Sequence, residues 1–215
     1  MSAQRPVVLL DLDGTLSDNF AGIANSVRYA LARLGSPDPG DPELKRCVGP
    51  PLRESFARLL ERPDSARIEA AMEAYRERYS VLGWQENVAY PGVMAALQAL
   101  AVMHARMFVC TSKPEVFARR IVAHFGFDSY VERVYGPDLA GLLDDKRKLL
   151  AHLLARESLD PGACVMVGDR HHDIAAAHAN GARAVGVLWG YGSREELAGA
   201  ERLLETPAEL ATLVQ

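Results

Sequence analysis

The chain has 215 residues, of which 49% are apolar, and its formal net charge is −4. This is enough apolar material for a full core, and it allows one domain plus a smaller module. The sequence has no run of Lys and Arg that would indicate binding to nucleic acid or to an anionic membrane surface. It also has no segment that approaches the ~20 uninterrupted apolar residues of a membrane span. The polar N-terminal residues 1–6 lack the apolar core of a signal peptide, so we expect a cytoplasmic location.

The first predicted element is a buried strand over residues 7–10, which are short, uncharged and rich in branched side chains. Asp11 and Asp13 follow it, and Gly14 lets the backbone turn sharply. Because ligands of open parallel sheets lie beyond the carboxyl ends of the strands, both carboxylates should face that crevice. Two such carboxylates repel each other unless a cation or a proton lies between them. The pair therefore indicates either a magnesium site or an acid beside a nucleophile.

Residues 17–88 show helical periodicity and no convincing strand. We expect three helices there, joined to the rest of the chain by linkers at residues 16–19 and about 83–90. The expected helix boundaries are Gly35 at the end of the first helix, Pro51 at the start of the second and Asp64 as the cap of the third, with proline-rich joints at residues 36–42 and 62–63.

After residue 90, strands alternate with helices, which is typical of a parallel sheet. Two pairs near the end of the chain, Ser193 with Glu196 and Thr206 with Glu209, have the spacing of capping boxes and predict two closing helices. The other expected elements are helices over residues 92–104, 114–125, 146–157 and about 173–180, and strands over 107–110, 131–136, 164–167 and 185–188.

Polar residues follow two further strands at the same predicted edge of the sheet. Thr111 and Ser112 come after the strand at 107–110, and their hydroxyl and backbone N–H groups could hold phosphate oxygens. Asp169 comes after the strand at 164–167. Mg²⁺ prefers oxygen ligands, so Asp169 could bind it together with Asp11 and the carbonyl of Asp13.

These groups suit phosphoryl transfer. Asp11 can attack phosphorus and form an aspartyl-phosphate. Asp13 can protonate the leaving oxygen and then deprotonate the water that hydrolyses the intermediate. Lys146 offers a compact positive charge to the same phosphate oxygens.

Four clusters in this order resemble the haloacid dehalogenase superfamily, in its phosphatase branch. Residues 11–16 meet the pattern D-x-D-G-T-L, and Thr111 meets the second motif, a strand that ends in Ser or Thr. The third motif, a Lys that opens a helix, is best met by Lys146, with Lys148 as the rival. Residues 168–173 meet the fourth, G-D-x-x-x-D.

The resemblance implies an α/β fold: a Rossmann-like parallel sheet core formed by residues 1–16 and 89–215, with residues 17–88 inserted as an all-helical cap. Such a cap closes over the crevice, excludes water and selects the leaving group. The implied site comprises catalytic Asp11, Asp13, Thr111 and Lys146, phosphate contacts Thr111, Ser112 and Lys146, Mg²⁺ ligands Asp11, Asp13 and Asp169, and Asp173 behind the metal site.

The favoured function is a Mg²⁺-dependent phosphomonoesterase for a small phosphorylated metabolite, by resemblance phosphoglycolate or a nucleoside monophosphate. Arg170 stands where phosphoglycolate phosphatases more often carry a small hydroxyl residue, whereas a subgroup similar to 5′-nucleotidases carries Arg. A phosphomutase and a catalytically silent regulator of the same fold are the alternatives. A dehalogenase is disfavoured because those enzymes lack the second aspartate, here Asp13. The oligomeric state does not follow from the sequence.

Some residues have a plainer interpretation beside the functional one. Asp173 could simply cap its helix. The neighbouring histidines 171 and 172 could bind zinc, although a hard cation suits the aspartates better. Arg53 and Arg76 are expected to form surface salt bridges, with substrate contact as the alternative, and Trp189 and Tyr191 could pack in the core or line the site.

Overall fold

The computed structural model describes residues 5–61 and 63–214, so the predicted outer bounds at residues 1 and 215, most of the polar N-terminal segment and residue 62 of the second joint lie outside the described residues. The chain divides into two compact units, residues 1–17 with 89–215 and residues 18–88. The two connecting segments pair as short strands, β2 (Ser17–Asp18) and β3 (Val88–Ala89). Among the described residues, no helix is long and apolar enough to cross a membrane.

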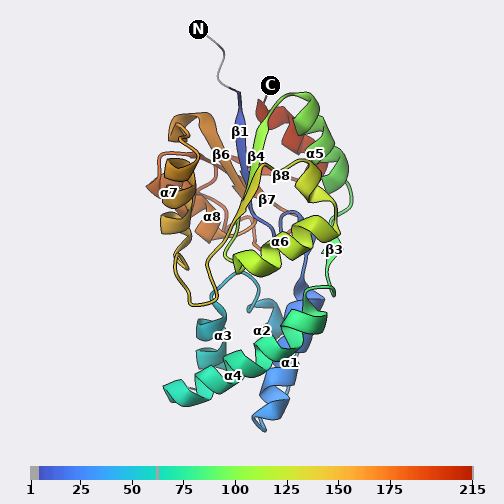
Figure 1. Ribbon diagram of the computed structural model, residues 1–215, viewed down its shortest axis with the longest axis vertical. Coiled ribbons are helices and arrows are strands. Elements are labelled where there is room, and N and C mark those ends of the chain that lie inside the picture. Colours follow the sequence, from blue (N-terminus) through green and yellow to red (C-terminus); the bar gives the residue numbers. More distant parts are fainter. Residues whose placement is uncertain (1–4, 62, 215) are drawn as a thin grey trace. The chain divides into compact units, whose positions relative to one another are not determined.

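The larger unit is built on a parallel six-stranded sheet in the order β5-β4-β1-β6-β7-β8 (Figure 1). The central strand has Leu9 opposite both Phe108 and Met166 of its two neighbours. All four residues of that strand are buried, as expected where helices cover both faces of a parallel sheet. The strands are β1 (Val7–Leu10), β4 (Arg106–Cys110), β5 (Arg133–Tyr135), β6 (Cys164–Gly168), β7 (Arg183–Val187) and β8 (Arg202–Leu204).

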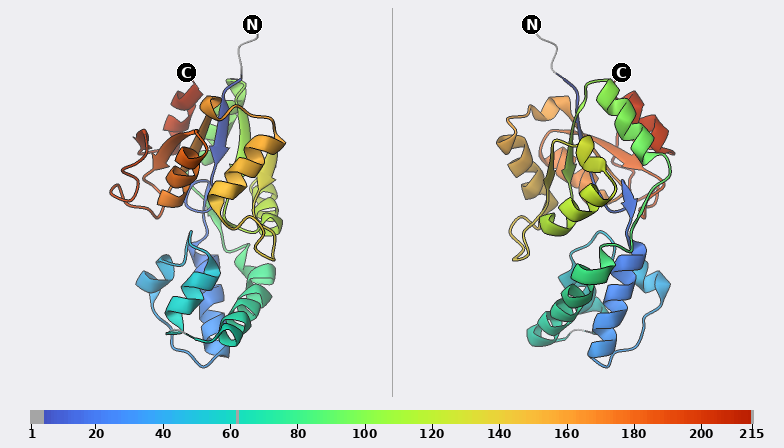
Figure 2. Two further views of the ribbon diagram at one scale, coloured as in Figure 1. Left: turned by 90° about the vertical axis from the view of Figure 1, so that its left-hand side faces the viewer. Right: turned by 45° about the vertical axis from the view of Figure 1, so that its right-hand side comes forward.

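Helices flank this sheet on both sides. Figures 1 and 2 show α7 and α8 on one face and α5 and α6 on the other. On the first of these faces, Leu9 belongs to the same buried cluster as Leu150 and Ala177, which ties strand to helices by apolar contact. The elements are α5 (Val93–Val102), α6 (Glu115–His124), α7 (Lys146–Arg156), α8 (His171–Ala179), and the short helices η2 (Phe127–Ser129), η3 (Pro161–Ala163) and η4 (Pro207–Val214).

The smaller unit is helical, as its periodicity predicts. Asp64 caps α4 by accepting a hydrogen bond from Arg67 N at 2.8 Å. Inside the unit, the Tyr75 and Tyr79 rings stack with centroids 5.2 Å apart, and Phe56 meets Tyr75 edge-on. The elements are α1 (Phe20–Arg33), α2 (Asp41–Lys45), α3 (Leu52–Leu59), α4 (Ser65–Arg78) and the π-helical turn η1 (Tyr79–Gly83).

Of the two predicted closing helices, the first is wrong and the second forms as a 3₁₀ helix rather than an α-helix. Ser193 Oγ does accept a hydrogen bond from Glu196 N at 3.2 Å, but residues 194–199 form turns rather than a helix. Thr206 N also donates to Glu209 Oε1 at 2.9 Å, yet the segment that follows is the 3₁₀ helix η4. A cap satisfies the first N–H groups, but it does not offset the cost of nucleating an α-helix in a short segment.

Three smaller differences concern one missed strand and the starts of two helices. The joint predicted at residues 36–42 contains the start of α2, and strand β8 between the two capping boxes was not predicted. Helix α8 begins at His171 rather than near Asp173. Such ends depend on local hydrogen bonds that the hydrophobic period does not report.

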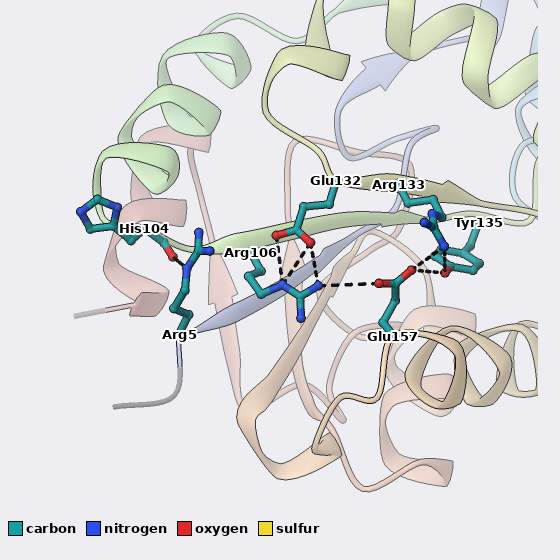
Figure 3. A network of polar contacts seen from close by, with 7 residues as sticks. All are labelled: Arg5, His104, Arg106, Glu132, Arg133, Tyr135 and Glu157. Carbon is teal, nitrogen blue, oxygen red and sulfur yellow. Dashed lines mark hydrogen bonds and ion pairs between the residues drawn. The ribbon is translucent and has the colours of Figure 1, made fainter. Parts of the chain in front are cut away.

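A polar network lies at the amino ends of β4 and β5 (Figure 3). Arg106, the first residue of β4, pairs with Glu132 at 2.6 Å and with Glu157 at 3.6 Å. Arg133, the first residue of β5, pairs with the same Glu157 at 2.9 Å. Each of these four charged groups therefore meets a group of opposite charge, and Arg5 in the same network donates to the His104 carbonyl at 2.8 Å.

Candidate active site

The turn after β1 is held tightly by its own backbone. Asp11 N donates to Val167 O of β6 at 2.9 Å, which extends the sheet pairing by one residue. The Leu12 carbonyl then accepts the N–H group of Leu16 at 2.9 Å. Gly14 has φ of +87°, and a Cβ there would lie 2.2 Å from Asp169 Oδ2. Glycine is therefore required both by the backbone conformation and by the close approach of Asp169.

Three buried aspartates from different elements converge at this edge of the sheet. Asp11 follows β1, Asp169 follows β6 and Asp173 lies in the first turn of α8. One oxygen of each lies within 4.8 Å of the other two, and the group is composed of carboxylates alone. The neighbouring His171 places Nδ1 3.0 Å from Glu196 instead. The geometry thus gathers the hard oxygen donors and leaves this imidazole outside.

Lys146, the first residue of α7, is buried among these aspartates. Its Nζ lies 3.0 Å from Asp11 Oδ1, and it also forms an ion pair with Asp173 Oδ1. Burial lowers the pKa of this ammonium, but the charges of Asp11 and Asp173 outweigh that effect and raise it. The rival Lys148 is exposed. Of the two candidates, Lys146 is therefore the one that lies with the aspartates, and it stays charged there.

Asp169 has one satisfied and one unsatisfied oxygen. Oδ2 accepts a hydrogen bond from Tyr191 N at 2.8 Å, whereas Oδ1 is buried and has no hydrogen-bond partner among the described residues. Burial, and then the charges of Asp11 and Asp173, raises the pKa of Asp169 well above its usual range. Burial likewise raises the pKa of Asp173 to about 6, against the opposing effect of Lys146. A divalent cation among these oxygens would remove both the repulsion and the unsatisfied acceptor.

Asp13 is not part of this group of three. Its Oδ2 lies 2.6 Å from Lys113 Nζ, and both side chains are largely buried. Lys113 was missed by the sequence reasoning, although its position two residues after Thr111 at the tip of β4 was a usable signal. The structure therefore brings together Asp11, Asp169, Asp173 and Lys146, and it pairs Asp13 with a second lysine.

Thr111 is buried at the end of β4, and its groups are only partly available. Its Oγ1 accepts a hydrogen bond from Lys113 N at 3.2 Å. Its N–H donates to Tyr135 O at 3.0 Å, so the expectation that this N–H contacts phosphate is wrong. The edge strand β5 takes that donor because parallel pairing continues one residue beyond β4. The Thr111 hydroxyl keeps its proton for donation, and Ser112 is half-buried beside it.

The plainer interpretation of Asp173, as the N-cap of α8, is wrong. Arg170 is the N-cap residue, and Asp173 lies three positions later, where its Oδ2 accepts a hydrogen bond from Arg170 N at 3.0 Å. Arg170 itself donates from Nε to Glu196 Oε1 at 2.8 Å. One carboxylate thus closes the start of α8 and also pairs with Lys146, which links helix position to the site.

The two aromatic residues after β7 also contact the site loops. Trp189 Nε1 donates to Thr15 O at 3.0 Å, and Tyr191 contributes the N–H that holds Asp169. The segment between them must pass close to Asp169, since a Cβ at Gly190 would lie 2.4 Å from Asp169 Cβ. These residues therefore support the site through backbone contacts and one indole N–H.

With this geometry, the comparison with known families gives a clear result. A family model described as haloacid dehalogenase-like hydrolase matches residues 8–187. The chain belongs to this family. Magnesium is typical of its phosphatases, and the predicted family and the predicted phosphatase class are confirmed.

Relatives of the chain include proteins named as a nucleotidase, a kinase and a phosphatase. The chain is 43% identical to a Pseudomonas aeruginosa 5′-nucleotidase over 98% of the chain and 94% of that protein. It is 42% identical to the tyrosine-protein kinase PtkA of Mycobacterium tuberculosis, but this match spans 86% of the chain and 63% of the kinase. The crystal structure of a predicted phosphatase from Clostridium acetobutylicum superposes with a TM-score of 0.91 at 33% identity, covering 98% of both chains. The predicted α/β fold is thereby confirmed.

Proposed function

We propose that the chain is a Mg²⁺-dependent phosphomonoesterase that works through an aspartyl-phosphate on Asp11. The observation that carries the proposal is the buried group of Asp11, Asp169 and Asp173 around Lys146, with one carboxylate oxygen of Asp169 unsatisfied. Buried charges are costly unless they are paired or bind metal, so such a group calls for a chemical role.

The balance of charge supports a divalent cation. When ionised, Asp11, Asp13, Asp169 and Asp173 carry four negative charges, and two ammonium groups, those of Lys113 and Lys146, face them. The excess of two negative charges matches one Mg²⁺. Asp11, Asp169 and the carbonyl of Asp13 would hold the ion, which would offset the charge of the substrate phosphate.

The protein groups then divide the chemistry. In the first half, an oxygen of Asp11 attacks phosphorus, the bond to the leaving oxygen breaks, and Asp13 gives that oxygen a proton. In the second half, a water molecule attacks phosphorus and gives a proton to Asp13. The bond between phosphorus and Asp11 breaks, and its electron pair returns to Asp11. Lys146 stays charged throughout and attracts the phosphate oxygens, with the Thr111 hydroxyl and Ser112 as further contacts.

For the substrate, we favour a nucleoside monophosphate over phosphoglycolate. The relative named 5′-nucleotidase is 43% identical, whereas a Xanthomonas campestris relative named phosphoglycolate phosphatase is 32% identical. Arg170 is consistent with this preference, because it stands where phosphoglycolate phosphatases more often carry a small hydroxyl residue.

We also propose that residues 18–88 act as a cap that selects the leaving group. Their compactness and their insertion between β1 and β4 support this role. Replacing them by a short Gly-Ser linker should leave hydrolysis of an aryl phosphate but remove discrimination between leaving groups. Retained discrimination would show that selectivity lies in the sheet unit.

The proposed function is tested by phosphate release from a panel of monoesters, with Mg²⁺ and with EDTA. The panel contains nucleoside 5′-monophosphates, phosphoglycolate, glucose 1-phosphate and p-nitrophenyl phosphate. We expect Mg²⁺-dependent release that is highest with a nucleotide. Isomerisation of the sugar phosphate without release would identify a phosphomutase, transfer from ATP to tyrosine would identify a kinase, and no turnover at all would identify a silent protein.

A further inference from the structure

We infer that Lys113 is a positioning residue for Asp13: its ammonium holds the Asp13 carboxylate in place to accept the proton of the water that hydrolyses the aspartyl-phosphate. The inference rests on the proposed function, since it assigns a step within that reaction. Lys113 is one of the six charged groups of the site, and neither the sequence motifs nor the group of three aspartates contains it.

The first support is the geometry of the pair. Lys113 Nζ lies 2.6 Å from Asp13 Oδ2, and the two side chains are only 5% and 13% exposed. The residues are 100 positions apart and come from the tips of β4 and β1. Removing two charges from water carries a desolvation cost, so a buried pair of this kind is weak evidence for stability and better explained by a role in orientation.

The second support is that the backbone of Lys113 is fixed on two sides. Lys113 N donates to Thr111 Oγ1 at 3.2 Å. On the other side, its carbonyl lies against Gly136, where a Cβ would come within 2.4 Å of Lys113 O. A lysine side chain is flexible, but here it starts from a main chain that the edge of the sheet holds in place.

The third support is that the two buried lysines have different partners. Lys146 pairs with Asp11, the proposed nucleophile, and with Asp173, another of the three buried aspartates. Lys113 pairs with Asp13, the proposed acid and base. Each half of the site therefore has its own cation, and removal of one lysine should affect one function more than the other.

The chemistry predicts which step depends on Lys113. In the second half-reaction, the water oxygen bonds to phosphorus, the bond between phosphorus and Asp11 breaks, and the water proton passes to the Asp13 carboxylate. This step needs the Asp13 carboxylate to be held in one place, and its contact with Lys113 Nζ at 2.6 Å provides that hold. In the first half-reaction a nitrophenolate leaves with little need of a proton, so formation of the aspartyl-phosphate from p-nitrophenyl phosphate depends little on Asp13. Loss of Lys113 should therefore slow hydrolysis of the aspartyl-phosphate more than its formation.

The experiment is rapid mixing of Lys113→Met with p-nitrophenyl phosphate and Mg²⁺. We expect a burst of nitrophenolate close to one equivalent per enzyme, followed by a steady rate roughly 100-fold or more below wild type, as for loss of a general base. Acid quenching should trap phosphate on Asp11. Lys113→Arg, which keeps a cation, should recover part of the steady rate, and Lys148→Met on an exposed lysine should behave as wild type.

Other results would overturn the inference. Equal slowing of burst and steady rate would mean that Lys113 only supports the fold, and a raised KM at unchanged kcat would make it a substrate contact. If Lys113→Met does not fold, Lys113→Arg must still slow the steady rate more than the burst, although to a smaller degree. Equal slowing of both rates in Lys113→Arg would refute the role. A wild-type enzyme that releases no phosphate from any monoester would instead refute the proposed function itself.

Discussion

Both ends of the central sheet carry clusters of charged residues, but the two clusters differ in their exposure to water. At the amino end, Arg106 and Glu132 are paired, with side chains 26% and 39% exposed. At the carboxyl end, Lys146 and Asp173 are paired, with side chains 5% and 1% exposed. Water screens the first pair and leaves it a small net contribution, whereas the second depends almost wholly on its protein neighbours.

The difference extends to the balance of charge. The network in Figure 3 pairs every one of its arginines with a glutamate or a carbonyl. The carboxyl end has more carboxylates than cations and a buried oxygen of Asp169 without a hydrogen-bond partner among the described residues. Similar pairs of residue types can therefore stabilise one end of a sheet and form the proposed reaction site at the other.

The largest effect is expected at Asp11, the proposed nucleophile. Asp11→Asn should lower phosphate release at least about 1,000-fold, roughly 4 kcal/mol in the barrier, because an amide does not form the acyl phosphate. The fold should persist, since Lys146 keeps its pair with Asp173. The measurement is kcat/KM beside circular dichroism, with the exposed Asp128→Asn as the matched control. Retention of more than about a tenth of the activity would make Asp11 something other than the nucleophile.

The next effect concerns the unsatisfied carboxylate. Asp169→Asn keeps an acceptor for Tyr191 N but loses the charge that a cation would meet. The Mg²⁺ concentration for half-maximal activity should rise by at least the roughly 10- to 100-fold seen when even outer partners of metal ligands are changed. At saturating Mg²⁺ the KM for substrate should stay near wild type. An unchanged Mg²⁺ requirement would remove Asp169 from the ligand set.

A smaller effect is expected at the amino end of the sheet. The hydrogen bond from Arg106 lowers the pKa of Glu132. The stabilisation from the pair of Arg106 and Glu132 is therefore present above the unfolded pKa of about 4.3. It is lost as the pH falls through the lower pKa that Glu132 has in the folded protein. Glu132→Gln should cost about 1 kcal/mol or less at pH 7, given the exposure of the pair. In urea unfolding near pH 3, the difference in the free energy of unfolding between Glu132→Gln and wild type should be smaller. The variant should keep the wild-type kcat/KM. A loss of activity would show that the two ends of the sheet do not differ in this way.

The smallest effect extends the comparison to the helical unit. Arg53 pairs with Glu69 on its surface, and both side chains are more than half exposed. Arg53→Gln should change the free energy of unfolding by no more than ~0.5 kcal/mol. It should also leave KM unchanged for every ester in the panel. A clear rise in KM for nucleotides alone would favour the alternative interpretation of Arg53 as a substrate contact.

The sequence alone determined most of the elements around the site and the strand tips at which the proposed site residues stand. Short apolar runs predict buried parallel strands, and the carboxyl ends of such strands share one edge, so Asp11, Thr111 and Asp169 could be placed together before any coordinates were known. The order of the motifs along the chain then indicated the family. Helical periodicity separated residues 17–88 from the rest in the same way, because it is a local property.

Only the tertiary structure decided which partners these residues meet. Lys113 pairs with Asp13 across 100 positions, and the Thr111 N–H is taken by Tyr135 of a neighbouring strand. The same is true of the capping residue Ser193, whose hydrogen bond forms although no helix follows it. Periodicity reports which side of an element is buried, but not which atom lies within 3 Å of another. That choice depends on the packing of strands and helices that are distant in sequence, and in this protein it set the charge balance of the site.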